Sequence, residues 1–318
     1  MTGTPASGSR TATFLLRQPR QVQGFREQLR SDDQVFVEGV FDEGDVFTQE
    51  QKKTALTMLW IPPGRFWMGS PATEPDHHDN EGPQHLVQLQ GYFMGQTPVT
   101  QGQWLAVMED FPFELPDQPR DRQLPLDRMS WEQAIDFCRK LSTITGRRYT
   151  LPSEAQWEYA CRAGTAGPFH FGDAIAQQLA RYDDDEIYDV KLIQDIDKAK
   201  EAMNFQSANS VVPVGLFPAN AWGLHDMHGN VAEWCLDSWH WSYADAPSDG
   251  SAWLDEEDGA PGVNRVRRGG SCRNHSARCR SAARNGIPYM LAGFRVVCLP
   301  QDPAVNSQSI NPSTLAVS

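Results

Sequence analysis

The residues whose types could bind a ligand or react are concentrated in the last third of the chain. Three runs rich in Gly, aromatic and Arg residues occur there, at residues 223–235, 265–271 and 292–297. Between the last two runs lie residues 272–291, which show no helical or strand period. Loops held by a rigid scaffold are where binding and catalytic groups tend to lie. Residues 272–291 are therefore the first candidate for a functional site.

Histidines and acids elsewhere in the chain form weaker candidates. His225, His228 and His240 lie in or just after the 223–235 run, and four consecutive acids occupy residues 183–186. Both residue types can bind metals. A His-x-x-His pair in a turn has no defined metal geometry, however, and an acidic run is more typical of a solvated face. We therefore expect neither group to be a metal site.

Short strands and three helices should position these residues. The patterns at residues 55–61, 66–68 and 85–93 predict strands. Ser or Thr followed three residues later by Gln predicts the start of a helix through a capping box. Three pairs fit that pattern: Thr100 with Gln103, Ser130 with Gln133, and Ser153 with Gln156. The second helix should end at Gly146 and the third at Gly164. The chain is thus expected to be an irregular α+β protein with two to three helices.

The domain organisation follows from changes in composition. Residues 1–52 are predicted to be an N-terminal extension with a polar helix near residues 18–30. Residues 53–300 are predicted to be one globular domain, and residues 301–318 a disordered tail. No signal peptide or membrane span is apparent, and the six cysteines are scattered as free thiols would be, so we expect a cytoplasmic protein.

The charge balance narrows the classes of partner. The 41 Asp and Glu outnumber the 28 Lys and Arg, and the formal net charge is −13. Non-specific nucleic-acid binding needs Lys and Arg to displace phosphate counterions. We therefore expect neither a nucleic-acid partner nor a membrane partner.

Several ordered segments resemble the sulfatase-modifying-factor superfamily, the domain of formylglycine-generating enzymes. The resemblance covers roughly residues 55–298. The matching segments are residues 61–70, 98–100 with Trp104, 151–160, 223–234, 268–271 (Arg-Gly-Gly-Ser) and 293–295 (Gly-Phe-Arg). The resemblance implies a C-type-lectin-like fold of the formylglycine-generating-enzyme type. It does not decide the function, because the superfamily contains both oxidases and binding proteins.

The oxidase function that the resemblance implies depends on copper and on two cysteines. The family pattern is Gly-Gly-Ser-x-x-Cys-x-x-x-x-Cys, in which two soft thiolates suit Cu(I). Counted from Ser271, the first cysteine position is Asn274 and the second is Cys279. Asn cannot supply a thiolate, and Cys272 stands at a different offset. A copper-dependent formylglycine-generating oxidase therefore remains an alternative and not the favoured function.

A structural calcium site is also implied by the resemblance. The turn before Glu-Trp binds Ca²⁺ in the enzymes that the chain resembles, with ligand spacings that match Asp226, Gly229, Val231 and Glu233. Calcium prefers several oxygen ligands and accepts a mixture of carboxylates and backbone carbonyls. We expect this turn to hold Ca²⁺.

The C-terminal segments resemble a binding branch more closely, the variable proteins of diversity-generating retroelements. Residues 279–285 (Cys-Arg-Ser-Ala-Ala-Arg-Asn) fit the pattern of that branch without a gap. The resemblance implies a non-catalytic protein in which diversified residues contact a ligand. We expect that ligand to be a protein, because no polar constellation fits a defined small molecule. The candidate contact residues are Cys272, Arg273, Asn274, His275, Ser276, Ala277, Arg278, Gly286, Ile287, Pro288, Tyr289, Met290 and Leu291.

Two further expectations concern the surroundings of this exposed face. Arg268, Arg280 and Arg295 should brace the scaffold through carboxylates or carbonyls. Four aromatic residues should border the face or pack under a long loop, the latter for at least two of them: Trp239, Trp241, Tyr243 and Trp253. A regulatory module of fixed sequence that binds one partner is a third class of function left open.

Overall fold

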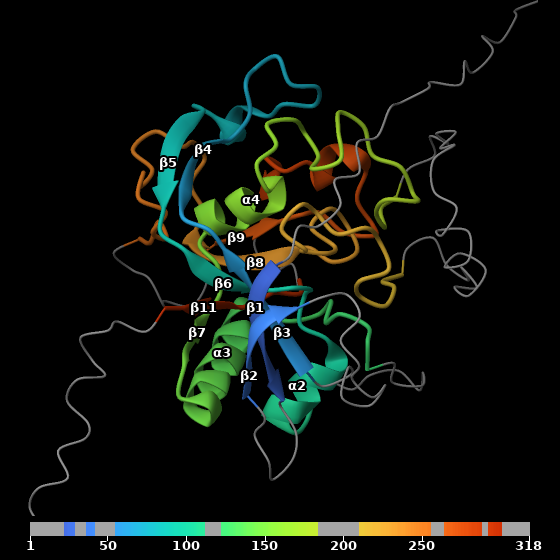
Figure 1. Ribbon diagram of the computed structural model, residues 1–318. Helices are drawn as coiled ribbons and strands as arrows, with labels where there is room; N and C mark the ends of the chain where they lie inside the picture. The colour runs from blue at the N-terminus through green and yellow to red at the C-terminus, as the bar shows by residue number, and fades with distance from the viewer. Residues whose placement is uncertain are drawn as a thin grey trace, which may run out of the picture.

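The largest sheet of the protein has six antiparallel strands and runs through its centre (Figure 1). The computed structural model describes residues 22–28, 36–41, 55–111, 122–183, 210–255, 264–287 and 292–300. The strand order is β2-β1-β3-β6-β11-β7. The strands are β1 (Val22–Gln28), β2 (Phe36–Phe41), β3 (Ala55–Ile61), β6 (Tyr92–Gly95), β7 (Arg148–Thr150) and β11 (Val297–Leu299).

Two smaller antiparallel sheets complete the strand set. One has the order β10-β9-β8 and the other pairs β4 with β5. The strands are β4 (Gly64–Met68), β5 (His85–Leu89), β8 (Glu233–Ser238), β9 (Arg265–Arg268) and β10 (Arg284–Asn285). The single strand predicted for residues 85–93 is wrong, because the chain leaves β5 and enters β6 in a different sheet. A Cβ on Gly91 would lie 2.3 Å from the Trp60 ring, so glycine permits this crossing.

Three α-helices occur among the described residues: α2 (Gln101–Met108), α3 (Trp131–Thr145) and α4 (Glu154–Arg162). All three predicted capping boxes are confirmed, with both reciprocal hydrogen bonds present in each. Helix α3 ends at Gly146, as predicted, with φ of 70°. Helix α4 reaches its left-handed cap at Ala163, one residue before the predicted Gly164. Two 3₁₀ turns, Asp79–Glu81 and Ser276–Cys279, are also present.

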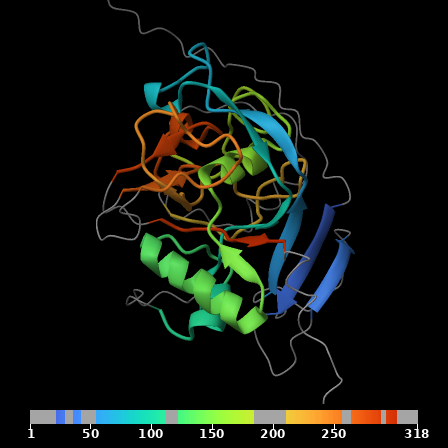
Figure 2. The ribbon, with the colours of Figure 1, turned by 90° about the vertical axis from the view of Figure 1, so that its left-hand side faces the viewer.

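The central sheet carries a hydrophobic core on each face. Successive side chains of a strand point to opposite faces, and in β3 Leu56 and Met58 belong to one buried cluster while Leu59 and Ile61 belong to the other. Helices α2 and α3 lie on the side of the first cluster, and α4 with β8 and β9 lies on the side of the second (Figures 1 and 2). The α+β class expected from the sequence is confirmed.

The N-terminal segment joins the central sheet. Residues 22–28 form a strand paired with β3, so the predicted polar helix at residues 18–30 is wrong. Phe25 is buried and packs on Phe93 at 4.9 Å between ring centroids, and this tertiary contact outweighs local helix preference. Most of the acidic run, residues 184–186, and the predicted tail lie outside the described residues. The domain limits at residues 52 and 300 remain predictions. Among the described residues, none of the helices is long and apolar enough to cross a bilayer.

Candidate functional site

Buried arginine–glutamate ion pairs hold the C-terminal scaffold together. Arg268 of β9 bonds to Glu158 of α4 and also donates to the carbonyls of Ala282 and Ala283, each at 2.8 Å. Arg284 of β10 forms two hydrogen bonds of 2.7 Å to the carboxylate of Glu154. A bidentate guanidinium–carboxylate pair restricts orientation as well as distance. Helix α4 is thereby locked to β9 and β10.

Arg280 makes a similar connection to the loop before β5. It donates to Glu74 Oε1 at 2.6 Å and to Glu81 Oε1 at 2.6 Å, and to the Asp76 carbonyl at 2.5 Å. The side chain of Arg280 is 2% exposed, so its charge is balanced by these carboxylates and not by water. The bracing role predicted for Arg268 and Arg280 is confirmed.

The segment between these braces presents polar side chains to solvent. We call residues 272–278 the display segment. Arg273, His275 and Arg278 are exposed, whereas Asn274, Ser276 and Ala277 are half-buried. Its first residue, Cys272, is buried, so the expected exposure is wrong at that position. The reason is that the Cys272 amide donates to the Asn230 carbonyl at 3.0 Å, which draws this end of the segment into the protein.

The second predicted contact segment, residues 286–291, also begins with a buried residue. Gly286 is buried against Trp239, and a Cβ added to Gly286 would lie 2.0 Å from the indole ring. Its expected exposure is therefore also wrong, because the close approach of the ring requires glycine there. Ile287 is 55% exposed. Residues 288–291, which include the predicted contact residues Pro288, Tyr289, Met290 and Leu291, lie outside the described residues.

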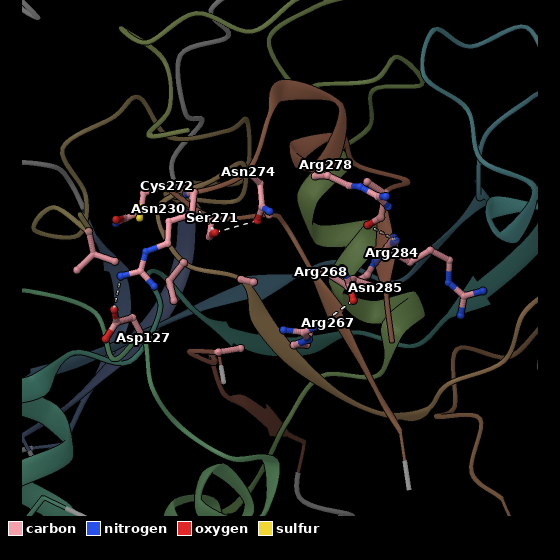
Figure 3. Close-up of a pocket in the computed structure, with 17 residues that line it drawn as sticks. Asp127, Asn230, Arg267, Arg268, Ser271, Cys272, Asn274, Arg278, Arg284 and Asn285 are labelled. Carbon is pink, nitrogen blue, oxygen red and sulfur yellow. Dashed lines mark hydrogen bonds and ion pairs between the residues drawn. The ribbon is translucent and has the colours of Figure 1, made fainter. Parts of the chain in front are cut away.

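A cavity of about 230 Å³, here named the central cavity, lies beside the display segment (Figure 3). Ser271, Cys272, Asn274 and Arg278 contribute to its wall. The rest of the wall comes from β9, β10 and the turn before β8, through Arg267, Arg268, Arg284, Asn285 and Asn230. The Ser271 hydroxyl donates to Asn274 Oδ1 at 2.8 Å, which fixes one edge of the wall (Figure 3).

A second cavity of about 310 Å³ adjoins the first and is apolar on one side. We name it the tryptophan cavity, because Trp239 and Trp241 line it together with Ile287. Arg278, Arg284 and Asn285 line both cavities. Trp241 is 78% exposed, which is unusual for so large an apolar side chain. The two cavities therefore form one continuous uneven face.

The other two aromatic candidates do not border this face. The Tyr243 ring is buried, and its hydroxyl donates to Glu154 Oε1 at 3.0 Å. Trp253 stacks on His240 with 3.7 Å between ring centroids. Two of the four aromatic candidates thus pack in the scaffold and two line a cavity, which agrees with the expectation.

The cysteine pair required for copper is not assembled at this site. Asn274 at the first position accepts the Ser271 hydrogen bond, as described above. Cys279 at the second position is fully buried in an apolar cluster with Phe169, Phe171 and neighbouring residues. Cys272 lines the central cavity, and partial burial raises the pKa of its thiol, which disfavours the thiolate needed for metal binding.

The predicted calcium turn has a mixed set of donors. Burial raises the pKa of Asp226; its Oδ2 accepts the Gly215 amide at 2.7 Å, and its Oδ1 is buried without a hydrogen bond. Glu233, in contrast, accepts two hydrogen bonds of 2.7 Å from Arg295 and one of 2.8 Å from the Trp157 indole. The arginine already balances this carboxylate, which confirms the bracing role predicted for Arg295.

Gly229 and Val231 are the two predicted carbonyl ligands of the same turn. Gly229 has φ of 86° and approaches Arg181 so closely that a Cβ would lie 2.2 Å from the Arg181 carbonyl oxygen. Val231 is buried. Asp226 offers an unbonded oxygen to a cation, but Glu233 would first have to give up hydrogen bonds to Arg295. Calcium binding at this turn stays a prediction.

The histidines of the last third do not converge. His225 Nδ1 pairs with the Phe217 carbonyl at 2.7 Å, and His228 Nδ1 with the Cys279 carbonyl at 2.7 Å. His240 Nε2 lies 3.0 Å from Asp255 Oδ1. Within the described parts of the chain, no group of three or more His, Cys, Asp or Glu side chains is placed to hold a metal ion.

Sequence reasoning missed Arg267 as a member of the site. It lies on β9 between two residues that belong to the scaffold, and it lines the central cavity. The signal was present in the strand pattern Arg-Val-Arg-Arg. Because Val266 faces the core, strand alternation directs Arg268 to the same face and Arg265 and Arg267 to the other.

The sequence matches one protein-family model and several known proteins. A family model described as the sulfatase-modifying factor enzyme 1-like domain matches residues 43–299. The chain is 30% identical over 265 residues to the serine/threonine-protein kinase Pkn1 of Chlamydia trachomatis, covering 75% of this chain and 37% of the kinase. It is 32% identical over 167 residues to the formylglycine-generating enzyme of Mus musculus, covering 51% of this chain and 39% of the enzyme. The chain thus spans less than half the length of these two relatives.

Solved structures share the fold. PvdO from Pseudomonas aeruginosa matches with a TM-score of 0.63 and 30% identity, over 82% of this chain and all of PvdO (100%). Treponema denticola variable protein 1 matches with a TM-score of 0.57 and 24% identity, over 82% of this chain and 98% of the variable protein. At that identity the second match establishes the fold alone.

Proposed function

Because the chain belongs to the sulfatase-modifying factor enzyme 1-like family, we propose that it uses the scaffold of that family to bind a protein ligand without catalysis. The ligand contacts the exposed side chains of the display segment and the rims of the two adjoining cavities. Function in this family must be argued from the site, because one fold carries several activities.

The proposal rests on one observation: the display segment carries exposed polar side chains, and both of its ends are held by the buried scaffold. The exposed residues Arg273, His275 and Arg278 lie between two buried residues that bond to the scaffold. Cys272 donates its amide to the Asn230 carbonyl, and Arg280 donates to Glu74. Exposed polar side chains beside an exposed tryptophan provide the mixture of adaptable hydrogen bonds and rigid aromatic area that binding surfaces use. Substitutions at the exposed positions should leave the scaffold intact.

The oxidase alternative lacks its thiol pair. Asn274 cannot ligate Cu(I) as a thiolate, and Cys279 is enclosed by aromatic side chains. We expect the reduced protein to bind no stoichiometric Cu(I) at this site and to leave a cysteine peptide of the sulfatase type unoxidised. Tight Cu(I) binding that is lost in both Cys272→Ser and Cys279→Ser would reinstate the oxidase.

The finer proposal is that the contact residues are diversified. The fold shared with Treponema denticola variable protein 1 supports it, as does the uninterrupted pattern at residues 279–285. The genome should then hold a nearby template copy of the segment encoding residues 265–297. That copy should differ almost only at adenines and be accompanied by a reverse-transcriptase gene. A genome without either would leave a binding module of fixed sequence.

A substitution experiment tests the display function directly. Arg273, His275 and Arg278 are replaced together by Ser, Asn and Tyr, and the melting temperature is measured. We expect a change of no more than about 2 °C, because surface substitutions outside structural networks typically change stability by less than about 0.5 kcal/mol each.

The matched control is Arg280→Ser, a single change in the same chain segment. It leaves Glu74 and Glu81 as buried carboxylates without their cation, which typically costs about 3–5 kcal/mol. If the triple variant melts as low as the control, the display segment is structural and the proposal is wrong.

A further inference from the structure

Arg267 is a buried cation whose charge is left unbalanced by the protein around it. Its side chain is 3% exposed, and no carboxylate within the described residues forms an ion pair with it. Four other buried arginines of this region, Arg268, Arg280, Arg284 and Arg295, each contact a glutamate. A buried charge without a counter-charge is costly and is retained where something else supplies the partner.

From this contrast we infer that the central cavity binds a carboxylate of the ligand, with Arg267 as its cation. The inference rests on the proposed function, because the carboxylate is supplied by the bound ligand. It adds a chemical class to the proposed site: an acidic side chain, or the carboxylate of a small acid, enters the cavity beside the display segment.

The contacts of Arg267 position its guanidinium and leave part of it unused. Its Nη2 donates to Asn285 Oδ1 at 2.8 Å (Figure 3). It also donates to the Ile287 carbonyl at 3.3 Å. The guanidinium lies 5.2 Å from the centroid of the Trp234 ring, which supports it from one side. Its Nε is buried without a hydrogen-bond acceptor. A pre-oriented donor that lacks an acceptor is what a carboxylate oxygen would satisfy.

The charge environment agrees with an anion. Burial without a compensating anion lowers the pKa of Arg267 to about 10, so the group is still charged at neutral pH. Arg278 adds a second, exposed cation to the wall of the cavity. The one acidic residue of the wall, Asp127, lies 3.9 Å from Arg273. This positive site stands out in a chain whose formal net charge is −13.

The remaining wall can complete the hydrogen bonds of a carboxylate. The side-chain NH₂ groups of Asn274 and Asn285 have no acceptor among the described residues, and both side chains line the cavity. The cavity of about 230 Å³ is more than a water molecule needs, which is roughly 10–15 Å³ in the same measure. A planar carboxylate with one negative charge matches one unbalanced guanidinium better than a phosphate dianion does.

Thermal melting with small probes tests the inference. The full chain is melted in sodium propionate and in propionamide, the neutral isostere, at matched ionic strength. We expect propionate alone to raise the melting temperature, by roughly 2–4 °C once its concentration is several times its Kd. Sodium phosphate is a third probe, and a larger rise with phosphate than with propionate would overturn the assignment to a carboxylate.

Three variants assign the response to Arg267. Arg267→Met keeps an unbranched stem as far as the arginine Nε and removes the charged end, so it should abolish the response to propionate. It should also melt no lower than the parent chain in chloride, because the unbalanced charge has gone; a purely structural Arg267 would instead give a lower melting temperature. Arg267→Lys keeps the charge without the planar fork and should show a reduced response. If Arg267→Met does not fold, Arg267→Lys decides the matter, and an undiminished response there would contradict the inference.

Arg139→Met is the matched control, because Arg139 is an exposed arginine on α3, outside both cavities. It should respond as the parent does. A parent chain that responds to no carboxylate probe, or an Arg267→Met variant that responds fully, would overturn the inference.

A pair of peptides distinguishes the two sources of a carboxylate. Acetyl-Gly-Ser-Glu-Ser-Gly-amide and its Gln counterpart are compared with propionate in the same assay. A response to the Glu peptide that exceeds the response to propionate indicates an acidic side chain of a protein ligand, whereas a response to propionate alone indicates a free small acid. Failure of every carboxylate probe would leave the triple-substitution result of the proposed function unchanged, so the two proposals can fail separately.

Discussion

Pairing between single residues decides what the site can bind. Glu233 lies at a position where the family resemblance implies a calcium ligand, yet its carboxylate accepts three hydrogen bonds, two of them from Arg295. A carboxylate has about four lone-pair sites, so little of its capacity remains for a cation. Arg267 is the opposite case, a cation whose own hydrogen bonds are incomplete. Residue type alone does not distinguish a charged side chain that is already paired from one that is not.

The calcium prediction is tested at this scale. If the turn holds Ca²⁺ as predicted, EDTA should lower the melting temperature, because loss of a bound ion destabilises the folded state by RT ln(1 + [L]/Kd). A change of less than about 1 °C would contradict the prediction and leave Arg295 as the charge that balances Glu233. Melting with and without added CaCl₂ is the measurement. A melting temperature that falls in EDTA and recovers with Ca²⁺ would establish the calcium site and give Asp226 Oδ1 its partner.

Helix α4 and strand β9 supply the side chains that hold the site in place. Helix α4 begins at a capping box and contributes Glu154 and Glu158, the two acids that bind Arg284 and Arg268. Strand β9 alternates, so Arg267 and Arg268 point to opposite faces of the strand; Arg268 pairs with Glu158, and both arginines contribute to the wall of the central cavity. On the other side of the sheet, α3 packs its apolar face on the first core cluster. The local sequence therefore determines where the helices begin. The periodicity of apolar residues determines which face of each helix and strand is buried.

The capping box of α3 gives a prediction at the scale of one element. Ser130→Ala removes the acceptor for the Gln133 amide and should cost about 1 kcal/mol, which corresponds to a fall of roughly 2–4 °C in the melting temperature. Urea unfolding followed by circular dichroism measures the change. Ser130→Asp is the control, because Asp caps as well as Ser does. Equal losses in both variants would show that packing around Ser130, and not the cap, accounts for the effect.

Across the whole molecule, buried polar contacts join segments that are far apart in sequence. His228 lies in the turn before β8, pairs with the Cys279 carbonyl next to the display segment, and accepts the His170 amide at 3.2 Å. Burial lowers the pKa of His228 to about 4. The folded protein therefore holds this histidine neutral, while the unfolded chain takes up a proton below about pH 6.5.

This histidine makes stability depend on pH. Its contribution is fully present above about pH 6.5 and is lost as the pH falls toward 4, at up to roughly 1.4 kcal/mol per pH unit. Asp237 acts in the opposite direction, because burial raises the pKa of its carboxyl to about 7. The quantity to measure is therefore the difference in the free energy of unfolding between the parent chain and His228→Asn. Urea unfolding at pH 7.5 and at pH 5 gives that difference at each pH.

Asn keeps a donor for the Cys279 carbonyl and cannot be protonated. The stability advantage of the parent over the variant should shrink by roughly 2 kcal/mol between the two pH values, since about 1.5 pH units of titration are removed. An advantage that is the same at both pH values would show that His228 does not titrate on unfolding.

The sequence by itself determined the helix starts, the α+β class and the location of the candidate site, because capping, strand alternation and turn chemistry act over a few residues. It also predicted that arginines brace the scaffold. Which carboxylate each arginine meets was decided only by the tertiary structure: Arg280 and Glu74 are separated by 206 residues. The same holds for the burial of Cys272, Cys279 and Gly286, and for the uncompensated charge of Arg267. Burial and charge balance depend on distant segments that folding brings together, and no local pattern encodes them.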